Sequence, residues 1–449
     1  MSSSDELLGL ARGGLEAARK GEAVEVYASW GRETEVKVFE GEVESLTSAE
    51  SRGVGVRVIS EGRLGYAYAA DPDPSEVAEL VEQARTNAAL AAPDEGNVLP
   101  DPQPIEPLEG TLLPEMLSTA AEEKVRLALE VERVCRAADQ RVTGVETALY
   151  GEGIGRAAIA STAGVEATGE RGDCWAVAFA LAGDDGEVQT GFGVQIARRP
   201  GDLDVARAGG EAAARAVRLL GARKPKTERM AVLLDPAAAT SFLGVLAAGL
   251  TAEAVLKGRS LFADKVGEVV ASDVVRLVDD GRNLAGPGAE PFDGEGMPTG
   301  RTSLIEDGRL QGFLHNTYTA TRMGAASTGN ASRGGFKSTP GVAPSNLILA
   351  PGEDTLEQLY ARAGRALLVQ DLIGVHSGAN PISGDFSVGA TGLIVEGGAI
   401  GAPIREATIA SSVLDILRAI VAVGNDLRFL GGSIGSPTIL VGEMTVAGS

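Results

Sequence analysis

The sequence predicts an α+β protein of two domains: an N-terminal α/β sandwich-like domain over residues 1–222 and a strand-rich C-terminal domain over 223–449. Three observations predict this. The chain has 449 residues, more than one domain usually holds. Amphipathic helical segments are mixed with strand patterns in the first half, and short strands with glycine turns dominate the second half. The basic, proline-bearing segment at 223–227 has the composition of a boundary.

The N-terminal elements follow in order. Asp5 can cap an amphipathic helix that ends near Lys20, and Pro74 suits an early position in a second helix over 73–92. A third, longer helix is expected over 114–139, and a fourth over 203–220. Alternating or apolar runs predict strands at residues 23–28, 35–39, 57–59, 64–69, 145–150, 156–161, 174–181 and 188–196. Prolines at 100, 102, 104 and 107 predict an extended connector near 97–112.

The C-terminal half starts with a buried-type strand at 230–234 and an Ala/Leu-rich helix over 237–256. Asp307-Gly308 between apolar stretches predicts a hairpin within 305–314. Further strands are expected at 347–349, 393–396 and 438–441, and further helices at 356–368 and 410–423.

Composition excludes several functional classes. The formal net charge is −22, which disfavours nucleic acids and anionic membrane surfaces, since both are bound mainly through Lys and Arg. The start of the chain lacks the basic and apolar regions of a signal peptide, and no run of 18 apolar residues predicts a membrane span. Cys135 and Cys174 are expected to be reduced core residues. Together these features predict a cytoplasmic protein.

The usual local zinc signatures are missing, because the only two histidines, His315 and His376, stand far apart in the chain. They could still converge in space with a carboxylate such as Asp385, or each could have a structural role. Residues 431–435 fit Gly-x-Ser-x-Gly by letters, but an apolar strand pattern follows Ser433 where a nucleophile elbow needs a helix. Residues 329–334 resemble the start of a phosphate-binding loop, but neither the Lys nor the helix follows.

Two polar, glycine-rich stretches stand out, at residues 315–334 and 376–387. They are either irregular surface loops or the walls of a cleft that holds an extended peptide backbone. The candidate substrate-binding residues in them are His315, Tyr318, Asn330, Arg333, His376, Asn380, Asp385 and Ser387.

These stretches also carry a family resemblance. The C-terminal half is similar to the TldD/PmbA family of metallopeptidases in the order and spacing of its motifs. The matching motifs include Phe292-Asp293-Gly294-Glu295-Gly296, Ser327-Thr328-Gly329-Asn330-Ala331, Ser383-Gly384-Asp385-Phe386-Ser387, Pro403-Ile404-Arg405-Glu406-Ala407 and Glu443-Met444-Thr445-Val446-Ala447. The first half agrees more loosely, through Gly53-Val54-Gly55-Val56-Arg57-Val58 and Gly65-Tyr66-Ala67.

The resemblance also implies a subtype. TldD subunits are similar to one another in a His-Glu-x-x-x-His helix and a late cysteine, which hold zinc. Here the three helix positions fall at about Leu243, Gly244 and Ala248, and no cysteine follows Cys174. The chain therefore resembles the TldE (PmbA) subunits, which lack the zinc site.

What this resemblance implies is a heterodimer. The TldD-type partner would carry zinc, and this chain, with no cofactor and no catalytic residue of its own, would shape a chamber for an unfolded or extended peptide. Two alternatives stay open: a stand-alone homodimeric binding or regulatory protein, and a free-standing hydrolase with a site that the sequence does not reveal.

Overall fold

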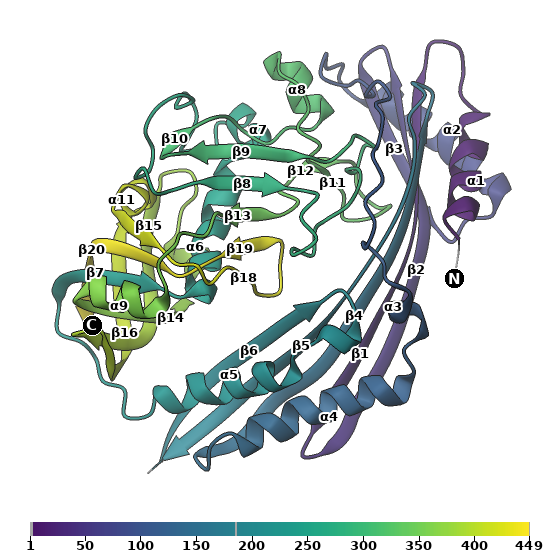
Figure 1. The fold of residues 1–449 in the computed structure, drawn as a ribbon. Coiled ribbons are helices and arrows are strands. Elements are labelled where there is room, and N and C mark those ends of the chain that lie inside the picture. The colour runs from purple at the N-terminus through teal and green to yellow at the C-terminus, as the bar shows by residue number, and fades with distance from the viewer. Residues whose placement is uncertain (1–2, 185, 449) are drawn as a thin grey trace.

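The structure, a computed structural model, describes residues 3–184 and 186–448. A long curved sheet forms one side of the molecule, and the C-terminal half packs against its inner face (Figure 1). The predicted α+β class is confirmed. None of the helices in the described part of the chain is long and apolar enough to cross a membrane.

The N-terminal sheet is fully antiparallel, with the strand order β3-β2-β1-β4-β5-β6. Its strands are β1 (Ala23–Phe39), β2 (Glu42–Ser60), β3 (Arg63–Ala70), β4 (Val142–Ser161), β5 (Glu166–Asp184) and β6 (Glu187–Ala197). They are longer than the sequence patterns predict. The two segments expected at 23–28 and 35–39 are one strand, as are those expected at 145–150 and 156–161.

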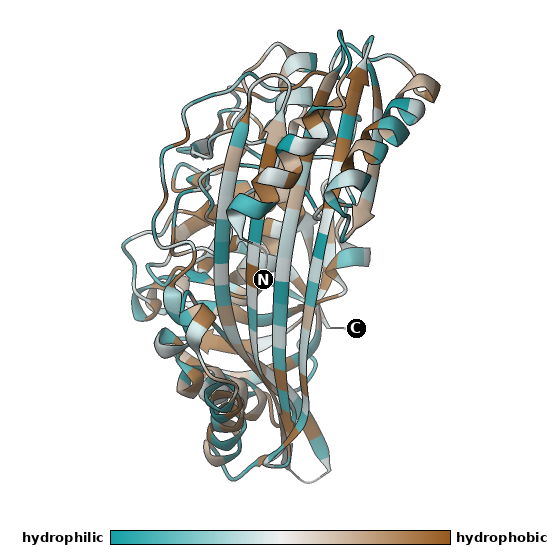
Figure 2. Ribbon diagram, turned by 90° about the vertical axis from the view of Figure 1, so that its right-hand side faces the viewer, coloured by the Kyte–Doolittle hydropathy of each residue, from teal (hydrophilic) through white to brown (hydrophobic). Residues whose placement is uncertain are grey.

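Helices cover only the outer face of this sheet. They are α1 (Ser4–Leu15), α2 (Pro74–Leu90), α3 (Pro114–Ser118), α4 (Ala121–Ala137) and α5 (Val205–Arg218), with the 3-10 turn η1 (Pro200–Asp202) before α5. Val24, Val26 and Ala28 of β1 are fully buried in one core with Leu7 of α1 and Val131 of α4. Seen from the outer side, helices lie over the ends of the sheet and the middle of its strands stays in view (Figure 2).

Two N-terminal helix predictions are corrected at their ends. Ser3, and not Asp5, caps α1, because its hydroxyl accepts from the Glu6 N–H while the Glu6 carboxylate accepts from the Ser3 N–H. The helix expected over 114–139 is broken between α3 and α4. Thr119 and Ala120 have extended backbone there, and the Thr119 hydroxyl donates to the Glu115 carbonyl.

The C-terminal half contains two six-stranded sheets. One has the order β10-β9-β8-β13-β19-β18, and the other β16-β15-β14-β7-β20-β17, with an added β16–β20 pairing that closes five of its strands into a ring. The strands are β7 (Glu228–Leu234), β8 (Leu277–Asp280), β9 (Arg301–Glu306), β10 (Arg309–Leu310), β13 (Leu347–Leu349), β14 (Arg365–Ile373), β15 (Asp385–Glu396), β16 (Ala399–Ser412), β17 (Ile420–Val423), β18 (Arg428–Phe429), β19 (Ile434–Ser436) and β20 (Ile439–Gly448). A short ribbon, β11 (Ala331–Ser332) and β12 (Gly341–Val342), stands apart.

Helix α6 (Pro236–Gly249) lies in the core that these sheets share. Its Phe242 ring meets Phe386 of β15 edge to face, with centroids 5.5 Å apart. The helix expected over 237–256 is interrupted, because Thr251 caps a separate helix, α7 (Ala252–Leu256), by accepting from the Ala254 N–H.

Two further helix predictions are too long. The helix expected over 356–368 is α9 (Leu356–Ala363), which stops at Gly364 with φ +65° before the chain enters β14. The helix expected over 410–423 shrinks to α11 (Val413–Arg418), because its flanks pair in β16 and β17. The hairpin prediction is confirmed: Asp307 and Gly308, both with positive φ, join β9 to β10.

Candidate functional site

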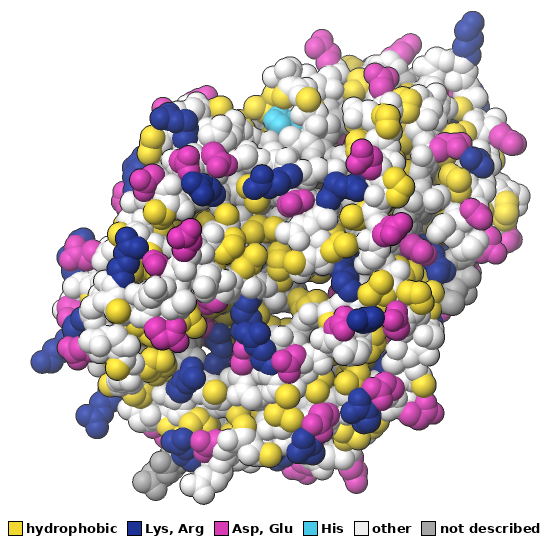
Figure 3. All heavy atoms as spheres, in the orientation of Figure 1, with side chains coloured by type: hydrophobic (Ala, Val, Ile, Leu, Met, Phe, Trp, Pro, Cys, Tyr) yellow, Lys and Arg dark blue, Asp and Glu magenta, His cyan; other side chains and the backbone are white. Residues whose placement is uncertain are grey.

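A cavity of about 850 Å³ lies between the inner face of the N-terminal sheet and the loops of the C-terminal half. Its walls come from β1, β2, β4 and β5 on one side and from residues 287–299, 331–335 and 343–345 on the other. In the space-filling view the surface is hollowed between the two halves, with hydrophobic side chains around the hollow and Lys and Arg side chains beside it (Figure 3).

The floor of this cavity is a part of the sheet where the inward-facing residues are glycine or have small side chains. Gly31 of β1 stands opposite Gly155 of β4 and Ser51 of β2, and two pairs further along, on the same face, Ser29 stands opposite Ala157. A Cβ on Gly155 would find its nearest neighbour, the Arg171 Nε, at 3.5 Å, so the glycine is not imposed by crowding. Glycine inside a strand costs about 0.5–1 kcal/mol relative to alanine. Here it leaves the sheet backbone bare and creates the space.

Charged and aromatic side chains stand around this floor. Arg171, Asp173 and Trp175 project from the same face of β5, because they occupy every second position of the strand. The charge of Glu290, whose Oε1 lies 2.8 Å from Arg171 Nη1, raises the pKa of Arg171. Burial raises the pKa of Asp173. The cavity therefore offers both hydrogen-bond donors and acceptors to a polar ligand.

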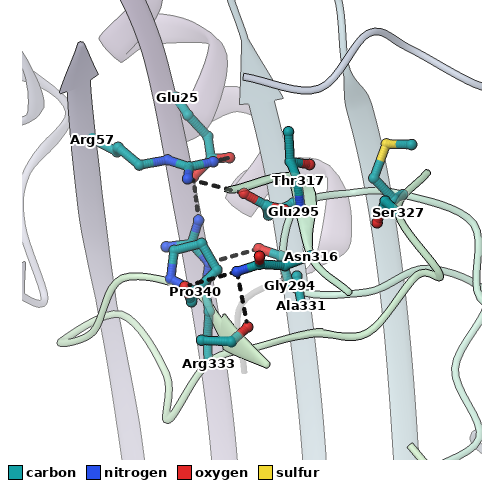
Figure 4. A network of polar contacts seen from close by, with 12 residues as sticks. Glu25, Arg57, Gly294, Glu295, Asn316, Thr317, Ser327, Ala331, Arg333 and Pro340 are labelled. Carbon is teal, nitrogen blue, oxygen red and sulfur yellow. Dashed lines mark hydrogen bonds and ion pairs between the residues drawn. The ribbon is translucent and has the colours of Figure 1, made fainter. Parts of the chain in front are cut away.

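One end of the cavity is closed by a buried ionic network (Figure 4). Arg57 of β2 contacts two carboxylates, Glu25 of β1 through Nη2 at 2.6 Å and Glu295 of the C-terminal half through Nη1 at 3.0 Å. Arg333 also contacts Glu25, and its Nε donates to the Gly294 carbonyl at 2.6 Å.

The charges in this network stabilise one another. Burial alone would raise the pKa of Glu25, but the charges of Arg333 and Arg57 hold it below its usual value. Burial would likewise lower the pKa of Arg57, and Glu25 and Glu295 raise it instead. The Arg333 guanidinium also lies 4.9 Å from the centre of the Tyr27 ring. The network joins the two halves and fixes Arg333 in the cavity wall.

Asp293 shapes the loop that carries Glu295. Its Oδ1 accepts the N–H groups of Glu295 and Met297, at 2.9 and 3.0 Å, and its Oδ2 accepts that of Ala331 at 2.8 Å. Burial, with a further contribution from Glu295, raises the pKa of Asp293 to about 7. This carboxyl is therefore a structural connector between the 292–299 loop and β11.

Models of one protein family match almost the whole chain. Domain 1 of the PmbA/TldA metallopeptidases matches residues 24–88, their central domain matches 115–220, and their C-terminal domain matches 227–448. The chain belongs to the PmbA/TldA metallopeptidase family. Its type within that family is that of PmbA (TldE).

Individual relatives of this family agree over nearly the full length. The metalloprotease PmbA of Escherichia coli O157:H7 is 28% identical, over 96% of this chain and 94% of its own. A crystal structure of a putative modulator of a DNA gyrase from Thermotoga maritima is 29% identical, covers 99% of both chains and has a TM-score of 0.88. TldE from Thermococcus kodakarensis, 24% identical over 99% of this chain and all of its own, shares the fold with a TM-score of 0.90.

Four of the eight predicted peptide-binding residues lie near the seam between the halves. Arg333 lines the cavity. Asn330 is buried, and its Nδ2 donates to Asp279 Oδ2 at 2.6 Å. Tyr318, on α8 (Thr317–Met323), donates through its hydroxyl to Asp94 Oδ2 at 3.0 Å. His315 is buried just before α8, and burial lowers its pKa.

The other four lie on a different surface. His376 is exposed on the short helix α10 (Val375–Gly378). Asn380 accepts the Ile382 and Ser383 N–H groups in a local turn, and Asp385 accepts from the Ser383 hydroxyl at 2.6 Å. Ser387 is exposed on β15. The structure thus does not gather the eight residues around one pocket, and the role of this second loop in binding stays a prediction.

The family name implies a metal, so the donor chemistry of α6 matters. The positions that correspond to the zinc motif carry a buried leucine (Leu243), a half-buried glycine (Gly244) and an exposed alanine (Ala248). Hydrocarbon side chains and a bare backbone cannot ligate zinc. In residues 3–184 and 186–448, no cluster of three His, Cys, Asp or Glu is arranged to hold a metal. The residues on α6 do not fit a zinc ion.

Sequence reasoning missed most of the cavity. Gly31, Gly155, Arg171, Asp173 and Trp175 were not singled out. One signal was available, since glycine occupies every second position from 151 to 155, and a strand with that alternation has one face without side chains. The sequence analysis predicts strands at 145–150 and 156–161 and leaves residues 151–155 between them, which hides the signal.

Proposed function

We propose that this chain is the zinc-less subunit of a two-subunit metallopeptidase. Its partner is a TldD-type chain that holds the zinc, and its own task is to hold an unfolded or extended peptide. The family assignment and the PmbA-type relative support this proposal, as does the absence of ligating side chains at the zinc-motif positions of α6.

The observation that carries the peptide-holding role is the cavity itself. It combines a floor of bare strands with Arg171, Asp173, Glu290 and Arg333 in its walls. An extended peptide has a polar backbone and variable side chains. Fixed charged and polar groups can bind the backbone, while the empty floor accepts side chains of different size.

The exposed 376–387 loop fits the same proposal. Among the described residues, the hydrogen bonds of its side chains are confined to residues 374–387, so we expect His376 and Asn380 to extend the chamber on the partner's side. Alanine at both positions should lower the activity of the two-chain complex severalfold without preventing its assembly.

Co-expression with a TldD-type chain tests the proposal. The expected result is stable co-purification and cleavage of an unfolded protein such as casein that requires both chains and is lost with a chelator. A homodimer that ignores the TldD-type chain would contradict the proposal and favour a stand-alone binding or regulatory protein. Cleavage by this chain alone that survives the chelator would also contradict it, in favour of a free-standing hydrolase.

A further inference from the structure

Half of strand β2 has only one neighbour. β3 pairs with β2 from Gly53 to Ser60, whereas β1 pairs with β2 along its whole length. Residues 42–51 of β2 therefore form a free sheet edge within the described part of the chain. Almost every side chain from 42 to 51 is exposed, so no other described segment covers this edge.

The register shows which backbone groups are free. The Arg52 carbonyl accepts the Asp71 N–H at 2.9 Å, so the backbone groups of Arg52 point away from β1. In an antiparallel sheet this direction alternates with each residue. The register with β1 is regular from Ala23 to Lys37. Leu46, Ser48 and Glu50 therefore each present an N–H and a carbonyl outward, and their neighbours bond to β1.

This edge leads directly into the cavity. Ala49, Glu50 and Ser51 belong to the free edge and also line the cavity. Ser51 stands opposite Gly31, on the bare floor. A strand added beside residues 46–50 would end where β3 begins, next to Ser51, and the rest of the peptide would turn from there onto the inner face of the sheet, towards the floor.

The charges beside the edge favour one class of peptide. More acids than bases lie next to it. Lys37 is paired with Glu44 at 2.8 Å, Arg32 stands opposite Glu50, and Arg52 is paired with Asp71 at 2.6 Å. The remaining acids beside the edge are Glu33, Glu35 and Glu42. The whole chain carries a formal charge of −22. A basic peptide is attracted to this edge, an acidic peptide is repelled, and a neutral peptide is neither attracted nor repelled.

We propose that residues 46–50 of β2 bind an extended, neutral or basic substrate peptide by strand addition and direct it into the cavity. This inference rests on the proposed peptide-holding function and specifies how the peptide is held. Main-chain hydrogen bonds provide the affinity, and so the site tolerates many sequences but disfavours proline in the paired segment.

The test compares Ser48→Pro with Ser48→Ala in the full-length chain. Proline removes the outward N–H of residue 48 and leaves the bonds of its neighbours to β1 intact, which is the edge position that proline tolerates. Both variants lose the contact between the Ser48 and Thr34 hydroxyls, so alanine is a matched control. The probe is a short dye-labelled peptide of alternating threonine and lysine, and fluorescence anisotropy measures its affinity.

Ser48→Pro is expected to weaken binding about tenfold, and Ser48→Ala by less than about twofold. A copy of the probe N-methylated along its central residues is expected to lose binding to the wild-type chain, which tests the same bonds without altering the protein. Equal binding by the proline and alanine variants would overturn the inference and leave the peptide-holding function standing. No binding by the wild-type chain would overturn both. If the wild-type chain and Ser48→Ala were dimers and Ser48→Pro a monomer, the edge would bind a second copy of this chain and not a peptide, which would overturn the inference.

Discussion

The inner face of the N-terminal sheet differs sharply between two positions, or levels, along the same strands. At the level of Glu25 and Arg57 it is sealed against the C-terminal half by buried ion pairs. A few residues further along, at Gly31 and Gly155, it is bare and faces a cavity of about 850 Å³.

This difference shows how the chain keeps a cavity open between two packed halves. The long, charged side chains at the first level reach across and bind the loops that carry Glu295 and Arg333. The glycines at the second level have no side chain that could contact those loops. The contacts at the sealed level fix the position of the loops that line the cavity above the bare level.

The largest expected effect is at the sealed level. Glu25→Gln removes the charge that Arg57 and Arg333 share. It leaves Arg57 with Glu295, and Arg333 with the carbonyls of Gly294 and Ser338. Breaking a buried ion pair on one side typically costs about 3–5 kcal/mol. Urea unfolding measures the change in the free energy of unfolding.

Glu166→Gln is the matched control for that variant. Glu166 bonds to Arg12 at 2.6 Å on the surface, where both side chains are about half exposed. The urea midpoint of this variant should stay close to that of the wild type. If the Glu25 and Glu166 variants unfolded alike, the buried network would not be what joins the two halves.

The next effect concerns Asp293, whose pKa of about 7 lies above the ordinary 3.8. The folded chain therefore binds more protons than the unfolded chain between these values, and this group's contribution to stability falls as pH rises from about 4 to 7. Wild type should lose about 3 kcal/mol relative to Asp293→Asn over that range, since each unit of pKa difference corresponds to about 1.4 kcal/mol. Parallel pH profiles of the two proteins would show that Asp293 is ionised without cost.

A third prediction concerns a variant that fills the bare floor of the cavity. Gly155→Val places a branched side chain on the cavity floor, where the nearest atom to a Cβ is 3.5 Å away. Because valine suits a strand, stability should hold or rise slightly, while affinity for an extended peptide should fall about tenfold. Gly155→Ala should lie between the two. Unchanged peptide affinity in anisotropy titrations of both variants would place the peptide elsewhere.

The smallest effect is expected at His376, on the exposed loop. His376→Ala should change the free energy of unfolding by less than about 0.5 kcal/mol, as surface substitutions do. Thermal unfolding of the isolated chain measures this. A large loss of stability would mean that the loop is part of the scaffold and not a surface available to a partner.

Sequence patterns were sufficient for local elements and insufficient for the cavity. The α2 helix, with Asp73 and Pro74 at its start, and the Asp307-Gly308 hairpin depend on neighbouring residues and were predicted correctly. Helix ends at Thr119, Thr251 and Gly364 were missed, because side-chain caps and strand pairing compete there with helical periodicity.

The candidate site needed information that no local pattern contains. The ion pair between Glu25 and Arg333 joins positions 308 residues apart. The floor depends on the register that brings Gly31 opposite Gly155. Arg333 was identified from the polar composition of its loop, but its partners could not be named until the strands were aligned.

Metal content, determined chain by chain, tests the central claim most directly. The complex with a TldD-type chain is purified, its two chains are separated under conditions that retain bound metal, and zinc is quantified in each by mass spectrometry. The account predicts about one zinc per partner chain and none above background in this chain. Stoichiometric zinc held by this chain alone would contradict it.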